Sequence, residues 1–201
     1  MKQKVAILAS GTGSLFEALV QHSLTSKNFE VVLLVSDQKS SGVIEKSMNL
    51  NIKNIVIDPK SYPDKDLWTK DLIKVLTEHK VDWIFCLGFM RILDNNVVSS
   101  YKNRIINSHP ALLPNFPGAH AVQDALAAGV TQTGATVHLI DEGIDTGPII
   151  LQKTVEIRPG DTKDSLHERI KEVEKKLICD AMDRLSQNKF AVVNGKVEFN
   201  S

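Results

Sequence analysis

The chain has 201 residues, and its 24 lysine and arginine residues balance 24 aspartate and glutamate residues, so the formal net charge at neutral pH is zero. This balance excludes a global attraction to nucleic acid or to an anionic membrane, so an anionic ligand needs a local site. No apolar stretch reaches the roughly 18 residues of a transmembrane helix, and the start has no signal-peptide cleavage pattern. With only two cysteines, we expect a cytoplasmic protein that acts on small molecules, without nucleic acid, membrane or metal.

The first half of the chain alternates short apolar runs with stretches of helical spacing. An apolar run at Val5–Ala9 is closed by Ser10-Gly11-Thr12-Gly13-Ser14, and an amphipathic stretch over residues 15–24 follows. This pattern predicts a strand, a glycine turn and a helix. Further strands are predicted at residues 31–35, 54–57, 81–87 and 104–107, with helical spacing between them such as that of residues 65–79. The alternation favours an α/β fold with a doubly wound, mainly parallel sheet and helices on both faces.

The second half has a different pattern. Two strand-like segments, residues 134–140 and 149–157, are joined by the polar loop Asp141–Pro148. After Pro159-Gly160, Asp161 is expected to cap a long amphipathic helix that ends near residue 186. Asn194-Gly195 then has the signature of a two-residue hairpin turn. We therefore predict one domain that ends in a long helix and a hairpin.

The glycine turn after the first strand has two interpretations. Gly11 and Gly13 allow the backbone to approach a ligand, and the amides that open the next helix, together with Ser14, can donate hydrogen bonds to a phosphate. Position 16 is phenylalanine, and a Gly-Lys-Ser/Thr sequence is absent, so neither a dinucleotide nor a nucleoside triphosphate is supported. The alternative is that the glycines only form a tight turn.

A polar cluster follows the strand predicted at residues 104–107. Asn107 and His109 alternate along the chain, so their side chains point to the same side at the carboxyl edge of the sheet, where α/β proteins bind ligands. An amide and an imidazole suit a carbonyl that becomes a tetrahedral oxyanion, as in acyl transfer. Asp145, between Gly143 and Gly147, is placed to favour the charged histidine and relay a proton. The competing interpretation is a structural histidine at a strand end.

Four segments carry a resemblance to a known family. Asn107-Ser108-His109-Pro110-Ala111-Leu112-Leu113-Pro114, followed by Phe116-Pro117-Gly118, resembles the asparagine-x-histidine-proline-serine-leucine-leucine-proline signature of folate-dependent formyltransferases. Gly88–Leu93, Asp141–Pro148 and Ser10–Ser14 resemble the folate pocket, the folate-binding and catalytic loop, and the substrate-phosphate turn of the same enzymes. Over nearly its whole length, the chain is similar to the phosphoribosylglycinamide formyltransferase family.

The resemblance implies roles for individual residues. It makes Asn107 and His109 the groups that steady the oxyanion, and it makes Asp145 the group that orients His109 and assists proton transfer. The residues that it implies for the phosphosugar substrate are Gly11, Thr12, Gly13, Ser14, Leu15, Lys65, Pro110 and Glu174. Those that it implies for folate are Met90, Arg91, Ile92, Leu93, Asn107, Ile140, Asp141, Glu142, Gly143, Ile144 and Asp145. For Lys65 and Glu174 the competing interpretation is a solvated helix face.

The resemblance also implies a reaction and a domain plan. We expect 10-formyltetrahydrofolate as the formyl donor and glycinamide ribonucleotide as the acceptor, in a monomer or weak homodimer. Residues 1–201 form the expected domain, with a phosphate-binding half over 1–100 and a folate-binding and catalytic half over 101–201. The alternatives are a 10-formyltetrahydrofolate hydrolase and a folate or phosphosugar binding protein without catalysis. Departures from the family pattern occur at Leu15, Ala111, Lys175 and Cys179.

Overall fold

A computed structural model describes residues 1–199 of the chain. The chain divides into two compact units, Met1–Ile106 and Asn107–Ser201. The last two residues of the predicted domain, Asn200 and Ser201, lie outside the described residues. Within residues 1–199, no helix is both long and apolar enough to span a bilayer.

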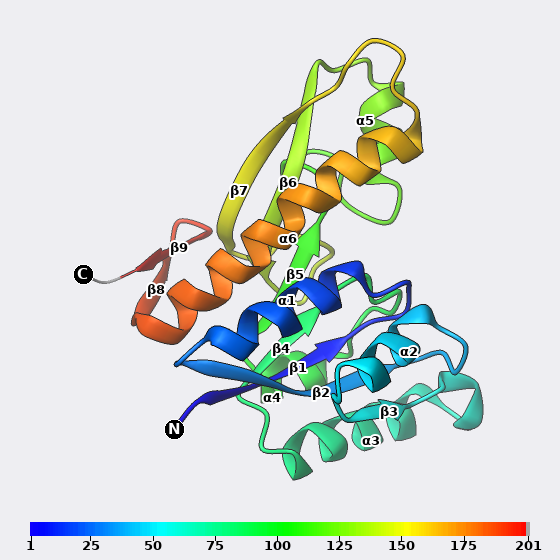
Figure 1. Ribbon diagram of the computed structural model, residues 1–201, viewed down its shortest axis with the longest axis vertical. Coiled ribbons are helices and arrows are strands. Elements are labelled where there is room, and N and C mark those ends of the chain that lie inside the picture. Colours follow the sequence, from blue (N-terminus) through cyan, green and yellow to red (C-terminus); the bar gives the residue numbers. More distant parts are fainter. Residues whose placement is uncertain (200–201) are drawn as a thin grey trace. The chain divides into compact units, whose positions relative to one another are not determined.

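The first unit alternates strands and helices, as the apolar periodicity predicts (Figure 1). Its elements are β1 (Gln3–Leu8), α1 (Ser14–Thr25), β2 (Phe29–Ser36), α2 (Gly42–Asn49), β3 (Asn54–Val56), the 3-10 turn η1 (Pro59–Ser61), α3 (Lys65–Glu78), β4 (Trp83–Cys86) and α4 (Asn95–Ser100). The short helices α2 and α4 were not predicted individually, because each has fewer than three turns and little periodicity to detect.

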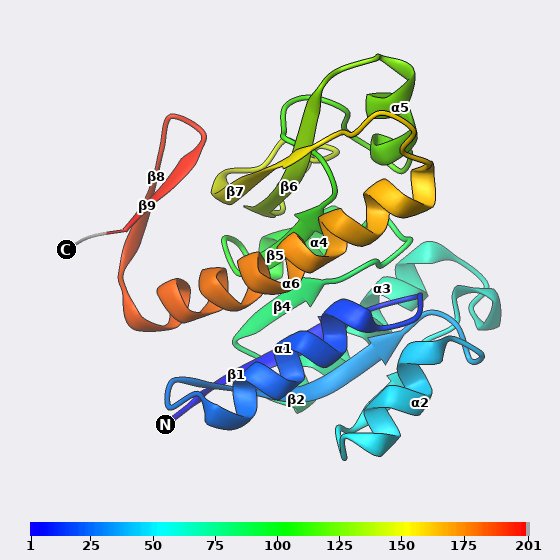
Figure 2. The same cartoon turned by 45° about the horizontal axis from the view of Figure 1, so that its top comes forward.

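The strands of the first unit form a parallel sheet in the order β3-β2-β1-β4. The direction of the crossovers reverses after β3, so α1 and α2 contact each other on one face, and α3 and α4 contact each other on the opposite face (Figures 1 and 2). All four residues of β4 are buried, as are the last four of β1 and of β2. Burial on both faces is the usual environment of a central parallel strand.

The carboxyl ends of β1 and β4 are tied together at one edge of this sheet. The backbone N–H of Ser10 donates to the carbonyl of Gly88 at 3.2 Å, and the N–H of Met90 donates to the Ser10 hydroxyl at 3.0 Å. The glycine turn and the start of the segment Met90–Leu93 therefore lie side by side at the sheet edge. This is the edge at which open α/β sheets bind their ligands.

The second unit is built around an antiparallel strand pair and a long helix. Its elements are the end of β5 (Ile105–His109), α5 (Ala121–Ala127), β6 (Gln132–Leu139), β7 (Ile149–Glu156), α6 (Lys163–Gln187), β8 (Phe190–Val193) and β9 (Lys196–Phe199). β6 pairs antiparallel with β7, and α6 packs on both strands and on α5 (Figure 2). Leu166, Ile170, Leu177 and Ile178 form part of the buried stripe of α6. This stripe, spaced at three and four residues, is what sets the helix on the sheet.

The predicted α/β class is confirmed, with mainly parallel pairing and a long C-terminal helix followed by a hairpin. At the hairpin turn, Asn194 and Gly195 both have positive φ angles of 48° and 71°, which two-residue turns between twisted strands require. The prediction that Asp161 caps α6 is wrong by one residue. Thr162 is the N-cap and forms a capping box with Ser165, while Asp161 instead binds Arg169 and the N–H of Arg158.

Candidate active site

Three polar side chains meet at the end of β5. Asn107 and His109 occupy alternate positions on that strand, and both reach Asp145, which lies in the loop between β6 and β7. The Nδ2 atom of Asn107 donates to Oδ1 of Asp145 at 3.2 Å. Nδ1 of His109 lies 3.3 Å from Oδ2 of the same carboxylate. The alternation along the strand thus brings the predicted trio together around one carboxylate.

His109 is held at both of its ring nitrogens. Its Nε2 lies 2.8 Å from the carbonyl oxygen of Phe116, and because a carbonyl only accepts, Nε2 carries a hydrogen. Nδ1 faces the Asp145 carboxylate, which favours a second hydrogen there. The side chain is only 5 % exposed, and this burial lowers the pKa of His109 below its ordinary value, although Asp145 and the Phe116 carbonyl oppose the shift. His109 is therefore a buried imidazole whose charge depends on Asp145.

Asp145 is a strongly acidic carboxyl group. Burial by itself would raise its pKa, but the His138 ring, the N–H of Gly118 and the His109 ring outweigh burial and lower the pKa to about 2. The Gly118 N–H donates to Oδ2 at 2.8 Å. Asp145 also has a positive φ of 54°, a backbone conformation that is uncommon outside glycine. At neutral pH this side chain is a carboxylate that accepts hydrogen bonds from β5 and from the loop after it.

His138 belongs to this cluster, although the sequence did not single it out. It lies on β6 with a side chain that is only 2 % exposed, and its Nε2 is 3.1 Å from Nδ2 of Asn107 and 3.5 Å from Oδ1 of Asp145. Its Nδ1 lies 2.8 Å from the Leu139 carbonyl and so carries a hydrogen. When the ring is neutral, Nε2 accepts from Asn107. When the ring is charged, Nε2 instead carries a hydrogen toward Oδ1 of Asp145, and this is the state in which His138 lowers the pKa of that carboxyl group. The pairing of β6 with β7 is irregular between Val137 and His138, and such irregularities redirect side chains in ways that alternation does not reveal.

The hydrogens of the predicted oxyanion donors are already used in this arrangement. The atom of Asn107 that faces a carboxylate must be its nitrogen, because two oxygens there would repel each other. That nitrogen gives its two hydrogens to Asp145 and to His138. The Nε2 hydrogen of His109 is taken by Phe116. A developing oxyanion must therefore displace one of these acceptors.

Ser108, between the two predicted catalytic residues, points to the other side of β5. Its hydroxyl donates to Oε1 of Glu174 on α6 at 2.6 Å, and both residues are buried. Burial raises the pKa of Glu174 to about 7, although the Ser108 hydrogen bond and Lys171 oppose that shift. Glu174 is therefore not on a solvated helix face. Pro110 follows His109 and is half-buried.

In the first unit, the glycine turn opens α1. Gly13 is the N-cap residue with a φ of 77°, and a Cβ there would lie 2.7 Å from a methyl carbon of Val43. Gly13 is thus required by the turn itself, whether or not a ligand binds. No side-chain hydrogen bond caps α1, and a Cβ at Gly11 would meet no neighbouring atom within 4 Å. Thr12 is exposed, and Ser14 and Leu15 are half-buried.

The predicted folate residues of the first unit include exposed apolar side chains. Met90 and Ile92 are each 70 % exposed, whereas Leu93 is buried. Nε of Arg91 donates to the buried Asp37 at 2.8 Å. Ile92 and Arg91 also line a hollow of about 390 Å³ together with Lys65, Pro59, Tyr62, Asp64 and Trp68. Lys65, predicted for the phosphosugar, therefore lies beside residues predicted for folate, 3.5 Å from Asp94.

Apart from Asn107 on β5, the predicted folate residues of the second unit lie in or next to the loop that carries Asp145. Ile140 and Asp141 are half-buried, and Glu142, Gly143 and Ile144 are exposed. Oδ1 of Asp141 accepts hydrogen bonds from the N–H of Gly143 at 3.0 Å and from the Thr146 hydroxyl at 2.7 Å. These bonds brace the loop from within and leave its outer side chains free to contact a ligand.

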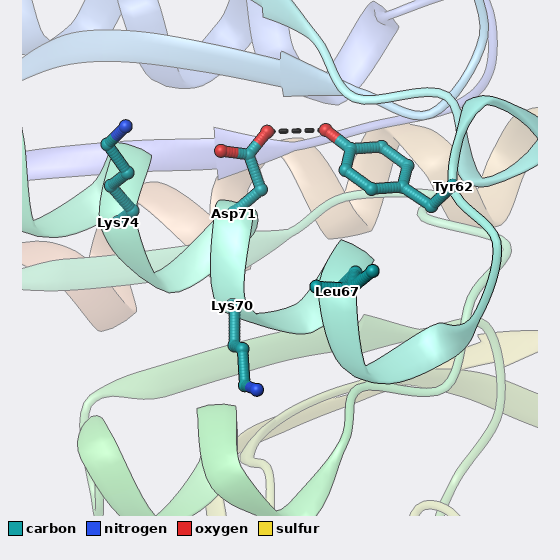
Figure 3. Close-up of a pocket in the computed structure, with 5 residues that line it drawn as sticks. All are labelled: Tyr62, Leu67, Lys70, Asp71 and Lys74. Carbon is teal, nitrogen blue, oxygen red and sulfur yellow. Dashed lines mark hydrogen bonds between the residues drawn. The ribbon is translucent and has the colours of Figure 1, made fainter.

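A second hollow of the first unit lies on α3 and contains none of the predicted site residues (Figure 3). The Tyr62 hydroxyl donates to Asp71, while Lys70 points away from that pair. The remaining lining residues are Leu67 and Lys74. Among residues 1–199, no cluster of histidine, cysteine, aspartate and glutamate has the arrangement of a metal site.

Comparisons with known proteins show the family of this chain. The formyl transferase family model matches residues 3–182. A phosphoribosylglycinamide formyltransferase of Bacillus subtilis is 43% identical over 176 residues, which cover 87% of this chain and 90% of that protein. The protein of the same name from Mycobacterium tuberculosis is 39% identical over 190 residues, 94% of this chain and 88% of its own length.

Solved structures give the same result. Glycinamide ribonucleotide transformylase 1 from Symbiobacterium toebii has a TM-score of 0.96 at 29% identity, covering 100% of this chain and 95% of its own. The transformylase 1 from Geobacillus kaustophilus has a TM-score of 0.89 at 39% identity, covering 92% of this chain and 100% of its own. A formyltetrahydrofolate deformylase from Pseudomonas syringae shares the fold with a TM-score of 0.90, but at 23% identity and over 67% of its length.

Proposed function

The chain belongs to the formyl transferase family, and on that premise we propose that it transfers the formyl group of 10-formyltetrahydrofolate to the amine of N1-(5-phospho-D-ribosyl)glycinamide. The products are the N2-formyl compound and tetrahydrofolate, and the reaction is a step of de novo purine biosynthesis. The identity to phosphoribosylglycinamide formyltransferases over most of both chains supports this substrate pair. No metal is needed, because the acceptor amine is itself the nucleophile.

The observation that carries the proposal is the carboxylate of Asp145 with Asn107 and His109 bound to it. Formyl transfer needs donors for an oxyanion and a group that accepts a proton from the attacking amine. His109 and Asn107 are the donors in our proposal, and Asp145 orients His109 and favours its charged form against the effect of burial. A low pKa of Asp145 serves this role, since only the ionised carboxyl group stabilises an imidazolium.

We describe the transfer as a direct attack. The lone pair of the substrate amine forms a bond to the formyl carbon, and the carbonyl electron pair moves to oxygen. The Nε2–H group of His109 leaves the Phe116 carbonyl and donates a hydrogen bond to the oxyanion. One N–H of Asn107 likewise leaves Asp145 or His138 and donates a second hydrogen bond to the oxyanion. The ammonium proton of the intermediate then passes, through water near Asp145, to the folate nitrogen. The oxyanion electron pair re-forms the carbonyl as the carbon–nitrogen bond to folate breaks, and tetrahydrofolate leaves with the proton on that nitrogen.

The remaining residues bind the two substrates in this proposal. Gly11, Thr12, Gly13, Ser14 and Leu15 hold the phosphate at the uncapped start of α1, where backbone N–H groups and the helix dipole favour an anion. Glu174 and Pro110 contact the sugar and glycinamide part. In the first unit, the exposed apolar side chains of Met90 and Ile92 suit a flat pterin ring. In the second unit, residues Ile140 to Asp145 are assigned to folate. Lys65 adds positive charge for the phosphosugar, and Arg91 and Leu93 contact folate; Lys65 and Arg91 line the same hollow.

One experiment tests the reaction and separates the rival activities. Purified protein is mixed with 10-formyl-5,8-dideazafolate, with and without glycinamide ribonucleotide, and release of the deformylated folate is followed. We expect release that depends on the amine and yields the formylated ribonucleotide. Release without the amine indicates a formyltetrahydrofolate hydrolase. Folate binding without release in either mixture indicates a binding protein.

We further propose a cytoplasmic location and a monomer or weak homodimer. The chain has two cysteines, and Cys86 is a buried free thiol, as is usual for proteins of a reducing compartment. Sedimentation velocity at several protein concentrations tests the oligomeric state, and a single concentration-independent dimer would contradict the proposal.

A further inference from the structure

β5 presents polar groups on both of its sides. Asn107 and His109 face Asp145 on one side, while Ser108, between them, reaches Glu174 on the other. The Ser108 hydroxyl and Oε1 of Glu174 are 2.6 Å apart, and the two residues are 8 % and 3 % exposed. A hydrogen bond from a hydroxyl to a carboxylate at this distance is short and strong.

Glu174 is an unusual residue for its position. It lies on the buried stripe of α6, with Ile170, Leu177 and Ile178 as buried neighbours on the same helix. Within the described part of the chain, Lys171 is the charged residue that acts on its pKa, and the amino group of Lys171 is bound to Glu168 at 2.6 Å. A buried carboxyl group without a cation bound to it destabilises a fold, and an apolar side chain would be more favourable there.

The Ser108 hydroxyl is the hydrogen-bond donor that favours the ionised form of this buried carboxyl group. Burial raises the pKa of Glu174 to about 7, and the Ser108 hydrogen bond opposes that rise. The neighbouring strand β6 supplies no cation to Glu174. Its buried polar residues are Thr133, Thr136 and His138, and the His138 ring is bound to Asn107 and the Leu139 carbonyl. Without the hydroxyl, Glu174 has no other hydrogen-bond donor from β5.

We propose that Ser108 is a positioning residue, which fixes the Glu174 carboxylate so that its remaining lone pairs accept the two neighbouring hydroxyls of the substrate ribose. This inference rests on the function proposed above. A carboxylate has about four acceptor positions, and one hydrogen bond from Ser108 leaves enough for a vicinal diol. Ser108 and His109 are adjacent on β5. The same strand therefore fixes the position of the sugar relative to the reacting amine.

The test is steady-state kinetics of Ser108→Ala with the full chain and both substrates. At pH values near neutrality, we expect the KM for glycinamide ribonucleotide to rise about tenfold, which corresponds to the loss of one hydrogen bond to a charged group. The kcat and the KM for the folate donor should change less than about twofold, because the trio on the other side of β5 is intact. The KM for the ribonucleotide should fall as Glu174 ionises, and in the variant the midpoint of that fall should lie about one pH unit higher.

Three further variants make the test specific. Ser108→Thr keeps the hydroxyl and should restore most of the affinity. Ser23→Ala removes another buried serine hydroxyl, bound only to the Val20 carbonyl in α1, and should leave the pH profile of KM unchanged. Glu174→Gln cannot ionise, so its ribonucleotide KM should be raised and constant across the pH range around 7 in which the unaltered chain varies.

The possible failures are distinguishable. An active Ser108→Ala variant with an unchanged ribonucleotide KM and pH profile would overturn the positioning role. A Glu174→Gln variant that keeps the pH dependence would overturn it as well, because another group would then be titrating. An unaltered chain that transfers no formyl group to the ribonucleotide would overturn the proposed function instead.

Discussion

Asp145→Asn is the substitution that tests the candidate site most directly. The amide has the size and shape of the carboxyl group but no charge, and one of its two oxygens becomes a nitrogen that cannot accept a hydrogen bond. In the unaltered chain, Oδ2 accepts from the Gly118 N–H at 2.8 Å and faces His109 at 3.3 Å, while Oδ1 accepts from Asn107 at 3.2 Å. Whichever way the amide turns, at least one of these contacts becomes a contact between two donors.

The expected loss of activity follows from these contacts. Removing the carboxylate lowers the already depressed pKa of His109, because the charge that opposes the effect of burial is gone. The fraction of charged imidazole at neutral pH falls accordingly. Loss of a positioned acid–base group typically costs about 10²–10⁴-fold in rate. We expect kcat to fall by about 10³-fold, while the KM for either substrate changes by less than about fivefold.

The assay is amine-dependent release of deformylated dideazafolate, measured for Asp145→Asn beside Asp164→Asn. Asp164 lies in the first turn of α6 and is exposed, so its substitution makes the same chemical change away from the trio and should leave kcat within about twofold. Circular dichroism melting checks that both variants fold. A folded Asp145→Asn variant with the turnover of the unaltered chain would refute the role that we assign to this carboxylate.

Three other substitutions have definite expected outcomes. Asn107→Ala should lower kcat by about 100- to 1,000-fold, as the loss of an oxyanion donor does elsewhere, and an unchanged kcat in the same assay would contradict that role. Gly147→Ala would place a Cβ 1.9 Å from the Leu139 carbonyl oxygen, so the loop of Asp145 must shift and kcat should fall about 100-fold; full activity would show that the loop tolerates the shift. The pKa of Glu174 is raised from 4.5 to about 7, so the native state binds the extra proton and the free energy of unfolding falls as pH rises through this range. Glu174→Gln removes that fall. Between about pH 4 and pH 8, urea titrations should show the free energy of unfolding of the variant rising by about 3 kcal/mol relative to that of the unaltered chain, at about 1.36 kcal/mol per pKa unit. Parallel curves of unfolding free energy against pH for the two chains would contradict this.

The parts of the site that could be predicted depend on local rules. Asn107 and His109 are two residues apart on a strand, so strand geometry alone places their side chains on one side. The approach of Asp145 to His109 required a longer inference, because it combines a polar loop after one strand with the end of another. The fold class was also accessible, since the alternation of apolar runs and helical spacing is strong in the first half of the chain.

The parts that could not be predicted depend on contacts between distant segments. His138 enters the cluster at an irregularity between β6 and β7, which no periodicity in the sequence indicates. The choice of Thr162 over Asp161 as the cap of α6 is decided by Arg169, two turns into that helix, which binds Asp161. Ser108 occupies the variable position of the signature, and its role becomes visible only through its hydrogen bond to Glu174 on α6.

The hydrogen-bond pattern of the trio also bears on how the site is protected before substrate arrives. His109 and Asn107 would be costly to bury with unsatisfied donors, at about 1–3 kcal/mol for each lost partner. The Phe116 carbonyl, Asp145 and His138 supply those partners from within the chain. A neutral formyl oxygen is a weaker acceptor than a carboxylate, so it competes poorly for these hydrogens, whereas an oxyanion competes well. Transfer of these hydrogen bonds from the protein acceptors to the oxyanion therefore stabilises the transition state more than the bound substrate. This difference is the condition for raising kcat rather than only lowering KM.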